Sequence, residues 1–416
     1  MNNKITIGLF GFGTVGNGLH EVLHKTPSLE ASIKKICIKD NNKQRSINKD
    51  YFTTNADELL EDAEINTIVE LIDDAGKAFE IVKKALQRGK AVVTANKKMI
   101  AAHFEELLQL QQQYKVPLLY EGACCASIPI IRNLEEYYDN DLLSSIRGII
   151  NGSTNYILTK INEEGLQFKE ALLEAQQLGF AENDPSLDIE GHDAANKLSI
   201  LIAHAFGCIA IPAEILYSGI CHIATQDANL ARQKQSNIKL VATAQKLSNG
   251  DIAAFVLPQF VNETDELAPV KNEFNAVVTE SCFSDKHFFK GKGAGAFPTA
   301  AAVLSDISAL RYQYKYEYRK LNSNPTSKPS NDFYLKVFVS AQQEEDLAAA
   351  LFEWVEEKHN EPNYNWLIGV IHAAKLKKDN WWQKPGISLI ACNEPLIEDI
   401  SYRQVNKRSL ELAGAA

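Results

Sequence analysis

The chain has 416 residues, a length that predicts two or three domains. Its composition is ordinary for a folded protein, with 45% hydrophobic and 23% charged residues. The formal net charge of −10 argues against nucleic acid as the main partner, because a surface that tracks phosphates needs a basic excess.

Neither a membrane anchor nor a disulfide framework is expected. The amino terminus enters a strand without an apolar signal region. The most apolar later run, Ser199–Tyr217, is interrupted by His204, Pro212 and Glu214, so we expect a buried helix and no membrane span. The seven cysteines are scattered without metal-ligand spacing, which favours a reducing, cytoplasmic compartment.

A glycine-rich turn follows the first predicted strand, Lys4–Phe10, and opens a helical pattern. The first glycine permits a tight turn, the second lets the backbone approach a pyrophosphate, and the third lets helix and strand pack closely. The amino terminus of the helix offers free N–H groups to phosphates. The turn therefore predicts a dinucleotide site made by Gly11, Phe12, Gly13, Thr14, Val15 and Gly16.

The second predicted strand, Ile33–Ile38, ends at Lys39 and Asp40. An acid at this place binds the ribose hydroxyls of NAD, whereas a base favours the 2′-phosphate of NADP. Both are present, and Lys43 and Arg45 follow closely. The cofactor is therefore NADP or NAD, and the basic residues favour NADP.

Two more strands, Thr67–Ile72 and Ala91–Thr94, flank a predicted helix at Ala78–Gln87. Strands that alternate with helices predict an α/β domain with a Rossmann-type, doubly wound parallel sheet. Ligands of such sheets bind at the carboxyl ends of the strands. Thr94 and Lys97 lie at such an end, although an exposed loop lysine would fit the same pattern.

Two polar turns follow. Tyr120–Pro129 is rich in small residues, which suggests close backbone contacts and carbonyls turned toward a cation, and it leads into a helix at Ile130–Tyr138. A strand at Ile146–Ile150 leads to Asn151–Tyr156, which opens another helix. This second turn suits an anion or a substrate carboxylate, and an ordinary helix cap explains much of it equally well.

An acidic loop and a lysine occupy the segment Leu178–Lys197. From Asp193 onward the apolar residues recur at helical spacing, so Asp193 and Lys197 share one face of a helix entrance. An acidic surface loop before a helix is the plain alternative. The carboxylates of the loop are Glu182, Asp184, Asp188, Glu190 and Asp193.

The remaining sequence predicts a mixed region and a small α+β module. A glycine-rich segment, Gly291–Thr299, precedes an alanine-rich helix that we expect to reach about Tyr316. The strands are expected at Ala253–Leu257, Ala276–Ser281, His287–Gly291, Phe333–Ser340, Trp366–His372 and Ile387–Cys392, with a helix at Glu344–Glu357. The domains predicted are 1–130 for the dinucleotide (completed by a return helix, 298–320), 131–297 for substrate and dimerisation, a linker at 321–332, and a C-terminal module at 333–416.

Six motifs together resemble homoserine dehydrogenase over nearly all of residues 1–320. They are Gly11–Gly16, Val92–Lys97, Ile128–Arg132, Asn151–Leu158, Ala181–Leu198 and Gly291–Asp306. The resemblance implies NAD(P)-linked interconversion of L-aspartate 4-semialdehyde and L-homoserine in threonine, methionine and isoleucine biosynthesis. It also implies a homodimer joined through the middle domain, the monofunctional form of the enzyme, and an ACT-like C-terminal module.

The resemblance assigns roles to residues. Lys197 matches the proton-donor lysine, Lys97 the second active-site lysine, and Asp193 the acid that holds Lys197. We expect a lowered pKa for a buried lysine beside another cation, which would suit proton exchange near neutrality. The expected substrate contacts are Glu182, Asp188, Gly152 and Ser153; Gly293 joins the cofactor residues; and a sodium-type cation is expected at Glu121 and the carbonyls of Cys124, Ala126 and Ile128.

Several features depart from the family pattern: Cys124–Ser127 replaces a glycine-richer segment, and Phe180 stands where a tyrosine often occurs. Asp73 and Asp74 replace a glycine pair near the expected cofactor, and the C-terminal module lacks the Asp-x-Pro-Gly turn of ligand-binding ACT modules. Two rival functions remain. A phosphorylating semialdehyde dehydrogenase would need a cysteine nucleophile with a partner histidine, and a non-catalytic dinucleotide sensor would have no need of both lysines.

Overall fold

The computed structural model describes residues 4–40, 43–45, 47–140, 142–323 and 327–401. The last 15 residues of the predicted C-terminal module and residues 324–326 of the predicted linker lie outside this description. No helix in the described ranges combines the length and the apolar run needed to cross a bilayer.

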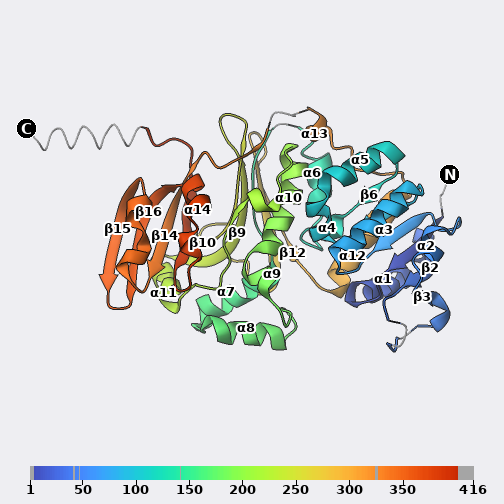
Figure 1. Ribbon diagram of the computed structural model, residues 1–416, viewed down its shortest axis with the longest axis horizontal. Coiled ribbons are helices and arrows are strands. Elements are labelled where there is room, and N and C mark those ends of the chain that lie inside the picture. The colour runs from blue at the N-terminus through green and yellow to red at the C-terminus, as the bar shows by residue number, and fades with distance from the viewer. Residues whose placement is uncertain (1–3, 41–42, 46, 141, 324–326, 402–416) are drawn as a thin grey trace, which may run out of the picture.

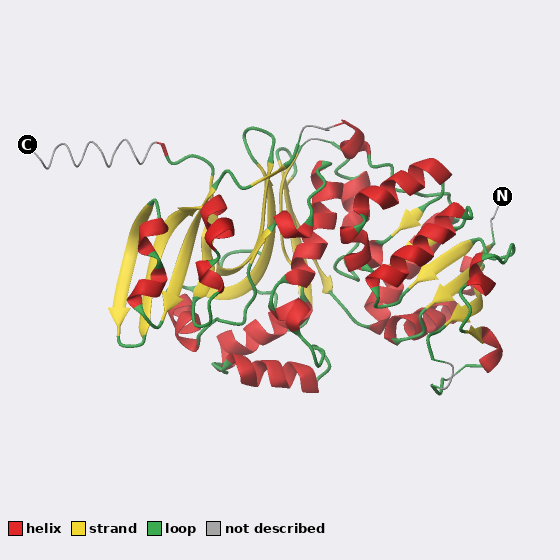
Figure 2. Cartoon of the chain, viewed as in Figure 1, coloured by secondary structure: helices red, strands yellow, loops and turns green. Residues whose placement is uncertain are grey.

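The amino-terminal domain is built on a parallel sheet in the order β3-β2-β1-β4-β5-β6. This order is that of a dinucleotide-binding fold, as predicted. Helices cover both faces of the sheet (Figure 2). The elements are β1 (Ile5–Phe10), α1 (Thr14–Lys25), β2 (Ala31–Cys37), β3 (Phe52–Thr53), α2 (Asp57–Leu60), β4 (Thr67–Glu70), α3 (Ala75–Gln87), β5 (Ala91–Thr94), α4 (Lys97–Ala102), α5 (Phe104–Tyr114) and β6 (Leu118–Leu119).

The chain returns to this domain through α12 (Ala296–Leu310), which packs beside α1 (Figure 1). A Cβ on Gly18 would lie 2.9 Å from the carbonyl oxygen of Ala296, so glycine permits this approach. The predicted continuous return helix 298–320 is wrong: α12 ends at Leu310, and a separate short helix, α13 (Arg319–Ser323), follows. The segment between them crosses back toward the middle domain.

The middle domain places helices against a second, mixed sheet. Its strands are β7 (Leu143–Ile149), β8 (Leu216–Tyr217), β9 (Ser236–Lys246), β10 (Ile252–Asn262), β11 (Phe274–Ser281) and β12 (Asp285–Lys292). Its helices are α6 (Ile130–Glu136), α7 (Gly152–Glu164), α8 (Phe168–Gln177), α9 (Ser186–Ile189), α10 (His192–Phe206) and α11 (Thr225–Gln233). The apolar run Ser199–Tyr217 is only partly helical, because α10 ends at Phe206 and Gly207 caps it with φ +63°.

The C-terminal strands continue this second sheet, whose order is β12-β11-β7-β9-β10-β17-β14-β16-β15. Only one ladder pair, Gln259 with Ala391, joins β10 to β17. The elements are β13 (Pro329–Ser330), β14 (Tyr334–Ala341), β15 (Trp354–Glu361), β16 (Tyr364–His372), α14 (Ala373–Asp379) and β17 (Ser388–Ile397).

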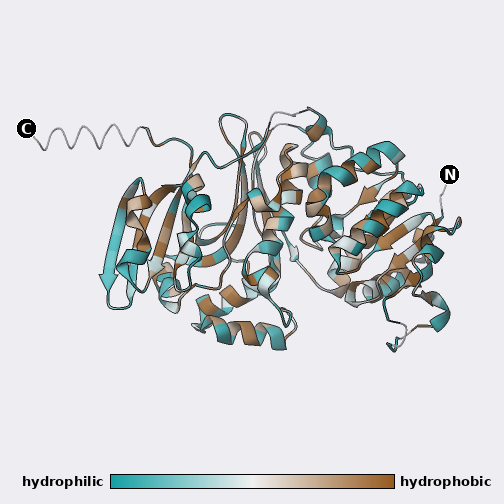
Figure 3. Ribbon diagram, in the orientation of Figure 1, coloured by the Kyte–Doolittle hydropathy of each residue, from teal (hydrophilic) through white to brown (hydrophobic). Residues whose placement is uncertain are grey.

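The helix predicted at Glu344–Glu357 is wrong. Two short 3₁₀ turns and the start of β15 occupy these residues. β15 pairs with β16 only and exposes nearly every side chain, and Figure 3 shows this outer strand as hydrophilic. Charged side chains protect such an edge strand against pairing with other chains. Pairing with β16 outweighs the helix propensity of the local sequence.

Candidate active site

A cleft of about 350 Å³ lies between the amino-terminal and middle domains, at the carboxyl ends of β4 and β5. The amino-terminal domain contributes the loops after these two strands, and the middle domain contributes the acidic loop and the start of α10. The residues that line it are Ile72, Asp73, Ala95, Asn96, Lys97, Lys98, Glu182, Asp184, Leu187, Asp188, Asp193 and Asn196. Its position is the one predicted for a ligand of a doubly wound sheet.

Two lysines from different domains meet at one carboxylate in this cleft. Lys97 Nζ lies 2.9 Å from Asp193 Oδ1, and Lys197 Nζ lies 2.7 Å from Asp193 Oδ2. Lys197 also donates to the carbonyl oxygen of Ile150 at 2.8 Å. The Lys97 side chain is 39% exposed and that of Lys197 only 9%, so one ammonium group faces the cleft and the other lies behind it. Lys97 lines the cleft and Lys197 does not, but the two ammonium groups meet at the Asp193 carboxylate.

Local structure fixes each of these three side chains. Asn96 accepts from the Met99 amide and so caps α4, which puts Lys97 at the first helical position. Gly191, with φ +89°, starts α10, which puts Asp193 in the first turn. A carboxylate is favoured there by the helix dipole. Lys197 follows one turn later on the same face.

The two ammonium groups dominate the electrostatics. Burial alone would raise the pKa of Asp193, but Lys197 and Lys97 more than offset it and hold this pKa well below its usual range. Burial alone would lower the pKa of Lys197, but the Asp193 charge outweighs it and the pKa is raised. The expectation of a lowered pKa for Lys197 is therefore wrong, because the Asp193 carboxylate outweighs burial.

Asn151 completes the polar cluster and was missed as a site residue. Its side-chain amide donates to Asp188 Oδ1 at 2.7 Å and to Asp193 Oδ2 at 2.9 Å. Its oxygen accepts from the Thr154 amide at 2.9 Å and so caps α7. The sequence indicated that Asn151 could cap a helix after a strand. It gave no sign that the Asn151 amide would contact Asp188 and Asp193, because these residues lie far along the chain.

The predicted substrate residues do not all line the cleft. Glu182 and Asp188 do, and Glu182 is exposed there. Gly152 packs on the loop before β11, where a Cβ would lie 2.7 Å from the carbonyl oxygen of Glu273. The Ser153 hydroxyl donates to the Phe180 carbonyl at 2.6 Å. Gly152 and Ser153 are thus neighbours of Asn151 outside the lining of the cleft.

The glycine turn leaves space at one position only. A Cβ on Gly11 would lie 2.5 Å from the Leu71 carbonyl oxygen, and one on Gly16 would lie 2.4 Å from that of Gly11. A Cβ on Gly13 would meet nothing within 4 Å. No side chain caps α1, so the backbone N–H groups of its first residues, Thr14 and Val15, are free for a ligand. This geometry fits a pyrophosphate.

The acids and bases after β2 differ in exposure. Lys39 and Asp40 are exposed, and Arg45 is half-buried. The Arg45 guanidinium donates to the carbonyl oxygens of Asp40 at 2.8 Å and Lys43 at 2.7 Å, and it lies over the Phe52 ring. A fixed positive charge therefore lies beside the end of the strand that faces the ribose in dinucleotide-binding folds.

Three other positions have structural partners. Thr94 is buried and donates to Glu70 Oε2 at 2.6 Å. Gly293 is buried against the Asn275 side chain, to which a Cβ would approach within 2.0 Å. Asp74 accepts from the Lys77 amide at 3.0 Å and caps α3, whereas Asp73 lines the cleft. The departure at Asp73 and Asp74 is therefore one helix cap and one acid in the cleft.

Glu121 is buried in a short 3₁₀ turn, and its carboxylate lies at the start of α6. Its two oxygens accept from the amides of Ile131 and Arg132, each at 2.9 Å. Burial raises its pKa to about 8. In the turn that follows, Cys125 and Ala126 both have positive φ. No cluster of three or more His, Cys, Asp or Glu side chains suited to a metal occurs in the described part of the chain, and a site made largely of carbonyls stays a prediction.

The cysteines offer no activated nucleophile near the cleft. Burial raises the pKa of Cys125 to about 12 and that of Cys124 well above its usual range. A thiol acts as a nucleophile only as thiolate, which these surroundings disfavour.

A larger groove of about 700 Å³ lies beside α12. It contains Arg132 and Arg311, and these two cations are already paired with Asp306 and Glu30.

Comparison with known proteins identifies a family. A homoserine dehydrogenase family model matches residues 129–308, and a model of the NAD-binding domain of homoserine dehydrogenase matches residues 11–121. The homoserine dehydrogenase of Lactococcus lactis is 38% identical over 314 residues, which make up 73% of this chain and 73% of that protein.

Solved structures agree. A homoserine dehydrogenase from Thiobacillus denitrificans superposes with a TM-score of 0.82 at 28% identity and covers 94% of this chain and 98% of its own. A hyperthermophilic archaeal homoserine dehydrogenase in complex with NADPH superposes with a TM-score of 0.65 at 29% identity, over 76% of this chain and 99% of its own.

Proposed function

Because the chain belongs to the homoserine dehydrogenase family, it is an oxidoreductase that uses a nicotinamide cofactor, and we propose that its chemistry occurs where Lys97 and Lys197 share Asp193. The reaction interconverts L-aspartate 4-semialdehyde and L-homoserine. The observation that carries the proposed location is the pair of ammonium groups on one carboxylate at the mouth of the nucleotide-binding sheet. A dinucleotide sensor would gain nothing from this arrangement.

The glycine turn fits the cofactor, which supplies or accepts a hydride when bound. Gly13 leaves open space for the pyrophosphate, and the uncapped amino terminus of α1 donates hydrogen bonds to it. We assign Gly11 and Gly16 to the shape of this turn, and Lys39, Asp40 and Arg45 to the ribose end. Thr94 and Gly293 support the backbone of the site, because the Thr94 hydroxyl is bonded to Glu70 and a Cβ on Gly293 would overlap the Asn275 side chain.

Lys197 is the proposed proton donor to the alkoxide that forms when the aldehyde is reduced. Its raised pKa keeps it protonated at neutral pH, and Asp193 fixes the direction of its N–H groups. Lys97, more exposed and on the cofactor side, stabilises the developing negative charge on oxygen. In the reverse direction the homoserine hydroxyl returns its proton to the same lysine.

The acidic side of the cleft suits the α-ammonium group of the substrate. Glu182 and Asp188 line it, and Asn151 holds the Asp188 carboxylate in place. We propose Glu182 as the main partner of the ammonium group because it is exposed to the cleft. Gly152 and Ser153 support this wall through their contacts with Glu273 and Phe180.

Side-by-side assays of homoserine-dependent reduction of NADP and NAD test the activity and its cofactor preference. We propose NADP, because Arg45, Lys39 and Lys43 gather near the ribose end. Arg45→Ala is expected to raise KM for NADP by about tenfold or more, since a charge-assisted contact to phosphate is lost. KM for NAD serves as the control and should not change, because NAD has no 2′-phosphate. A parallel rise in both would contradict the assignment.

Two glycine variants separate cofactor contact from folding. Gly13→Ala should leave the melting temperature unchanged and weaken NADP binding by about tenfold, because a methyl group enters space reserved for the pyrophosphate. Gly16→Ala should lower the melting temperature without cofactor, since its methyl group would overlap the Gly11 carbonyl at a cost of about 1–3 kcal/mol. Thermal unfolding with and without NADP measures both effects. Equal melting temperatures of the two variants, with and without NADP, would contradict these assignments.

A homodimer formed through the middle domain is also proposed. β12 ends the second sheet, and Phe288 on it and Phe283 before it are 43% and 85% exposed. Exposed apolar side chains at a strand edge suit a symmetric pairing of two copies. Sedimentation equilibrium should give twice 46.2 kDa, and Phe288→Asp should shift the population toward monomer. A wild-type monomer at micromolar concentration would contradict the proposal.

We also propose a cation site, an ACT-like C-terminal module and a cytoplasmic location. A sodium-type cation at Glu121 and the carbonyls of Cys124, Ala126 and Ile128 is supported by the buried carboxylate, whose ionised form a cation would stabilise. An ACT-like module is supported by the order β17-β14-β16-β15, in which the fourth strand lies beside the first, as in ferredoxin-like folds. A cytoplasmic location is supported by seven free cysteines, all in the described residues.

A further inference from the structure

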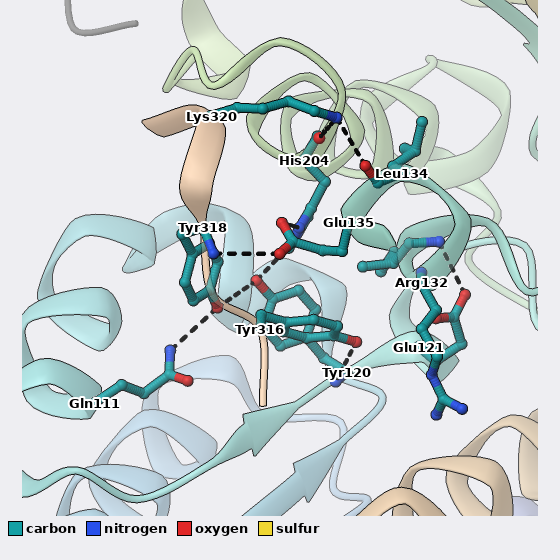
Figure 4. A network of polar contacts seen from close by, with 11 residues as sticks. Gln111, Tyr120, Glu121, Arg132, Leu134, Glu135, His204, Tyr316, Tyr318 and Lys320 are labelled. Carbon is teal, nitrogen blue, oxygen red and sulfur yellow. Dashed lines mark hydrogen bonds and ion pairs between the residues drawn. The ribbon is translucent and has the colours of Figure 1, made fainter. Parts of the chain in front are cut away.

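A buried chain of hydrogen bonds connects the helix of Lys197 to the amino-terminal domain, away from the cleft (Figure 4). Gln111 Nε2 donates to the Tyr318 hydroxyl at 3.1 Å, and the Tyr318 and Tyr120 hydroxyls are 2.9 Å apart. The Tyr120 hydroxyl lies 2.8 Å from His204 Nε2, and His204 Nδ1 lies 2.6 Å from Glu135 Oε1. We name these five residues the tyrosine–histidine chain.

The two ends of the tyrosine–histidine chain set its direction. Gln111 Oε1 accepts from the Leu118 amide, so its nitrogen must be the donor toward Tyr318. At the other end the Glu135 carboxylate can only accept. One arrangement gives every hydroxyl both a donor and an acceptor: Tyr318 donates to Tyr120, Tyr120 donates to a neutral His204, and His204 donates from Nδ1. In the opposite direction, the Tyr318 hydroxyl would accept twice and its own proton would have no acceptor in the chain.

All of these groups are removed from water. His204 and Tyr120 are each 1% exposed, and Tyr318 is 5% exposed. A buried hydrogen-bonding group that loses its partner retains the full cost of desolvation. The chain is therefore a specific link, and a rearrangement that breaks one bond in it is disfavoured.

The link acts on the helix that carries the proposed chemistry. His204 lies seven residues after Lys197 on α10, which is two turns and about 10 Å along the axis, on the same face. The start of α10 meets the amino-terminal domain through Asp193 and Lys97. The end of α10 meets the same domain through His204 and Tyr120, and Lys320 donates to the carbonyl oxygens of His204 and Leu134.

We propose that Tyr120, Tyr318 and His204 are positioning residues for the reaction, because they fix the axial position of α10 relative to the nucleotide-binding sheet. This inference rests on the proposed role of Lys197. With the link intact, the Lys197 ammonium group meets both Asp193 and the oxygen of a bound substrate. With the link broken, the end of α10 is free to shift by a fraction of an ångström, and the lysine leaves its reactive position.

Single hydroxyl deletions test the inference. Tyr318→Phe and Tyr120→Phe are expected to lower kcat for homoserine oxidation by about tenfold or more, since small displacements of a reacting group have effects of this size. KM for NADP should not change, because the glycine turn is distant. Tyr316→Phe is the matched control: its hydroxyl lies in the same aromatic cluster but outside the tyrosine–histidine chain, and it accepts from the Tyr120 amide at 3.4 Å.

A double variant separates positioning from general destabilisation. In the Lys197→Ala background, Tyr318→Phe should cause no further loss of the residual turnover, because the group being positioned is absent. A further loss of the same factor would overturn the inference, as would wild-type kcat in both single variants or an equal loss in Tyr316→Phe. If Tyr120→Phe does not fold, Tyr318→Phe decides alone, since it breaks the link at the two bonds that the Tyr318 hydroxyl makes, to Gln111 and to Tyr120. Full turnover of Lys197→Ala would instead refute the proposed function.

Discussion

Lys197→Ala is expected to lower kcat for homoserine oxidation by about a thousandfold and to leave NADP binding intact. The variant removes the group that exchanges a proton with the reacting oxygen, and it leaves the glycine turn untouched. kcat and kcat/KM should fall together, because the interaction is made in the transition state. Steady-state kinetics and fluorescence titration of NADPH measure the two effects.

Lys197→Arg distinguishes charge from proton transfer. Arginine keeps a positive charge near Asp193 but does not release a proton in proteins. We expect turnover far below wild type, although the ion pair survives. Wild-type turnover in either variant would mean that another group transfers the proton, and Lys97, at the same carboxylate, would then be the candidate.

Asp193→Asn is expected to have the largest effect on stability and a loss of turnover of about a hundredfold or more. The carboxylate is 6% exposed and pairs with both lysines, so its neutralisation leaves the buried ammonium of Lys197 without a counter-charge. Breaking a buried ion pair costs about 3–5 kcal/mol. Urea unfolding with and without NADPH would measure the loss.

The pH dependence of this loss has a defined sign. Because the pKa of Asp193 is lowered in the folded state, its contribution is present above the ordinary aspartate pKa and is lost as the pH falls through the folded value. The gap in stability between wild type and Asp193→Asn should therefore be widest near neutrality and should shrink in acid. Asp188→Asn is the control, since Asp188 accepts from the same Asn151 amide but belongs to neither ion pair. A gap that does not depend on pH would contradict the assignment.

Features that depend on short, local spacing were predictable from the sequence. The spacing of the three glycines predicted a tight turn at Gly11, a ligand approach at Gly13 and close helix packing at Gly16. In the structure, Gly11 and Gly16 lie against backbone carbonyls and Gly13 faces open space. The pairing of Asp193 with Lys197 follows from helical spacing alone. The strand-end rule placed Lys97 at a ligand site, and the family resemblance added Lys197.

Features decided by distant partners were not predictable in this way. Asn151 looked like a helix cap, and only the fold brings Asp188 and Asp193 to its amide. The segment Glu344–Glu357 has good helix formers, yet pairing with β16 makes part of it a strand. The direction of the pKa shift of Lys197 depends on whether burial or the Asp193 charge is stronger, and that balance depends on distances that only the fold sets.

The contact between β10 and β17 determines where the polypeptide can be truncated. One apolar cluster contains Phe255 and Leu257 of β10 together with Phe333, Leu335 and Leu389 of the C-terminal strands. A chain cut before Phe333 would turn these faces of β10 to water and would leave its edge open. The last fifth of the protein is thus part of the core, and expression of the first 330 residues alone would yield an incomplete core.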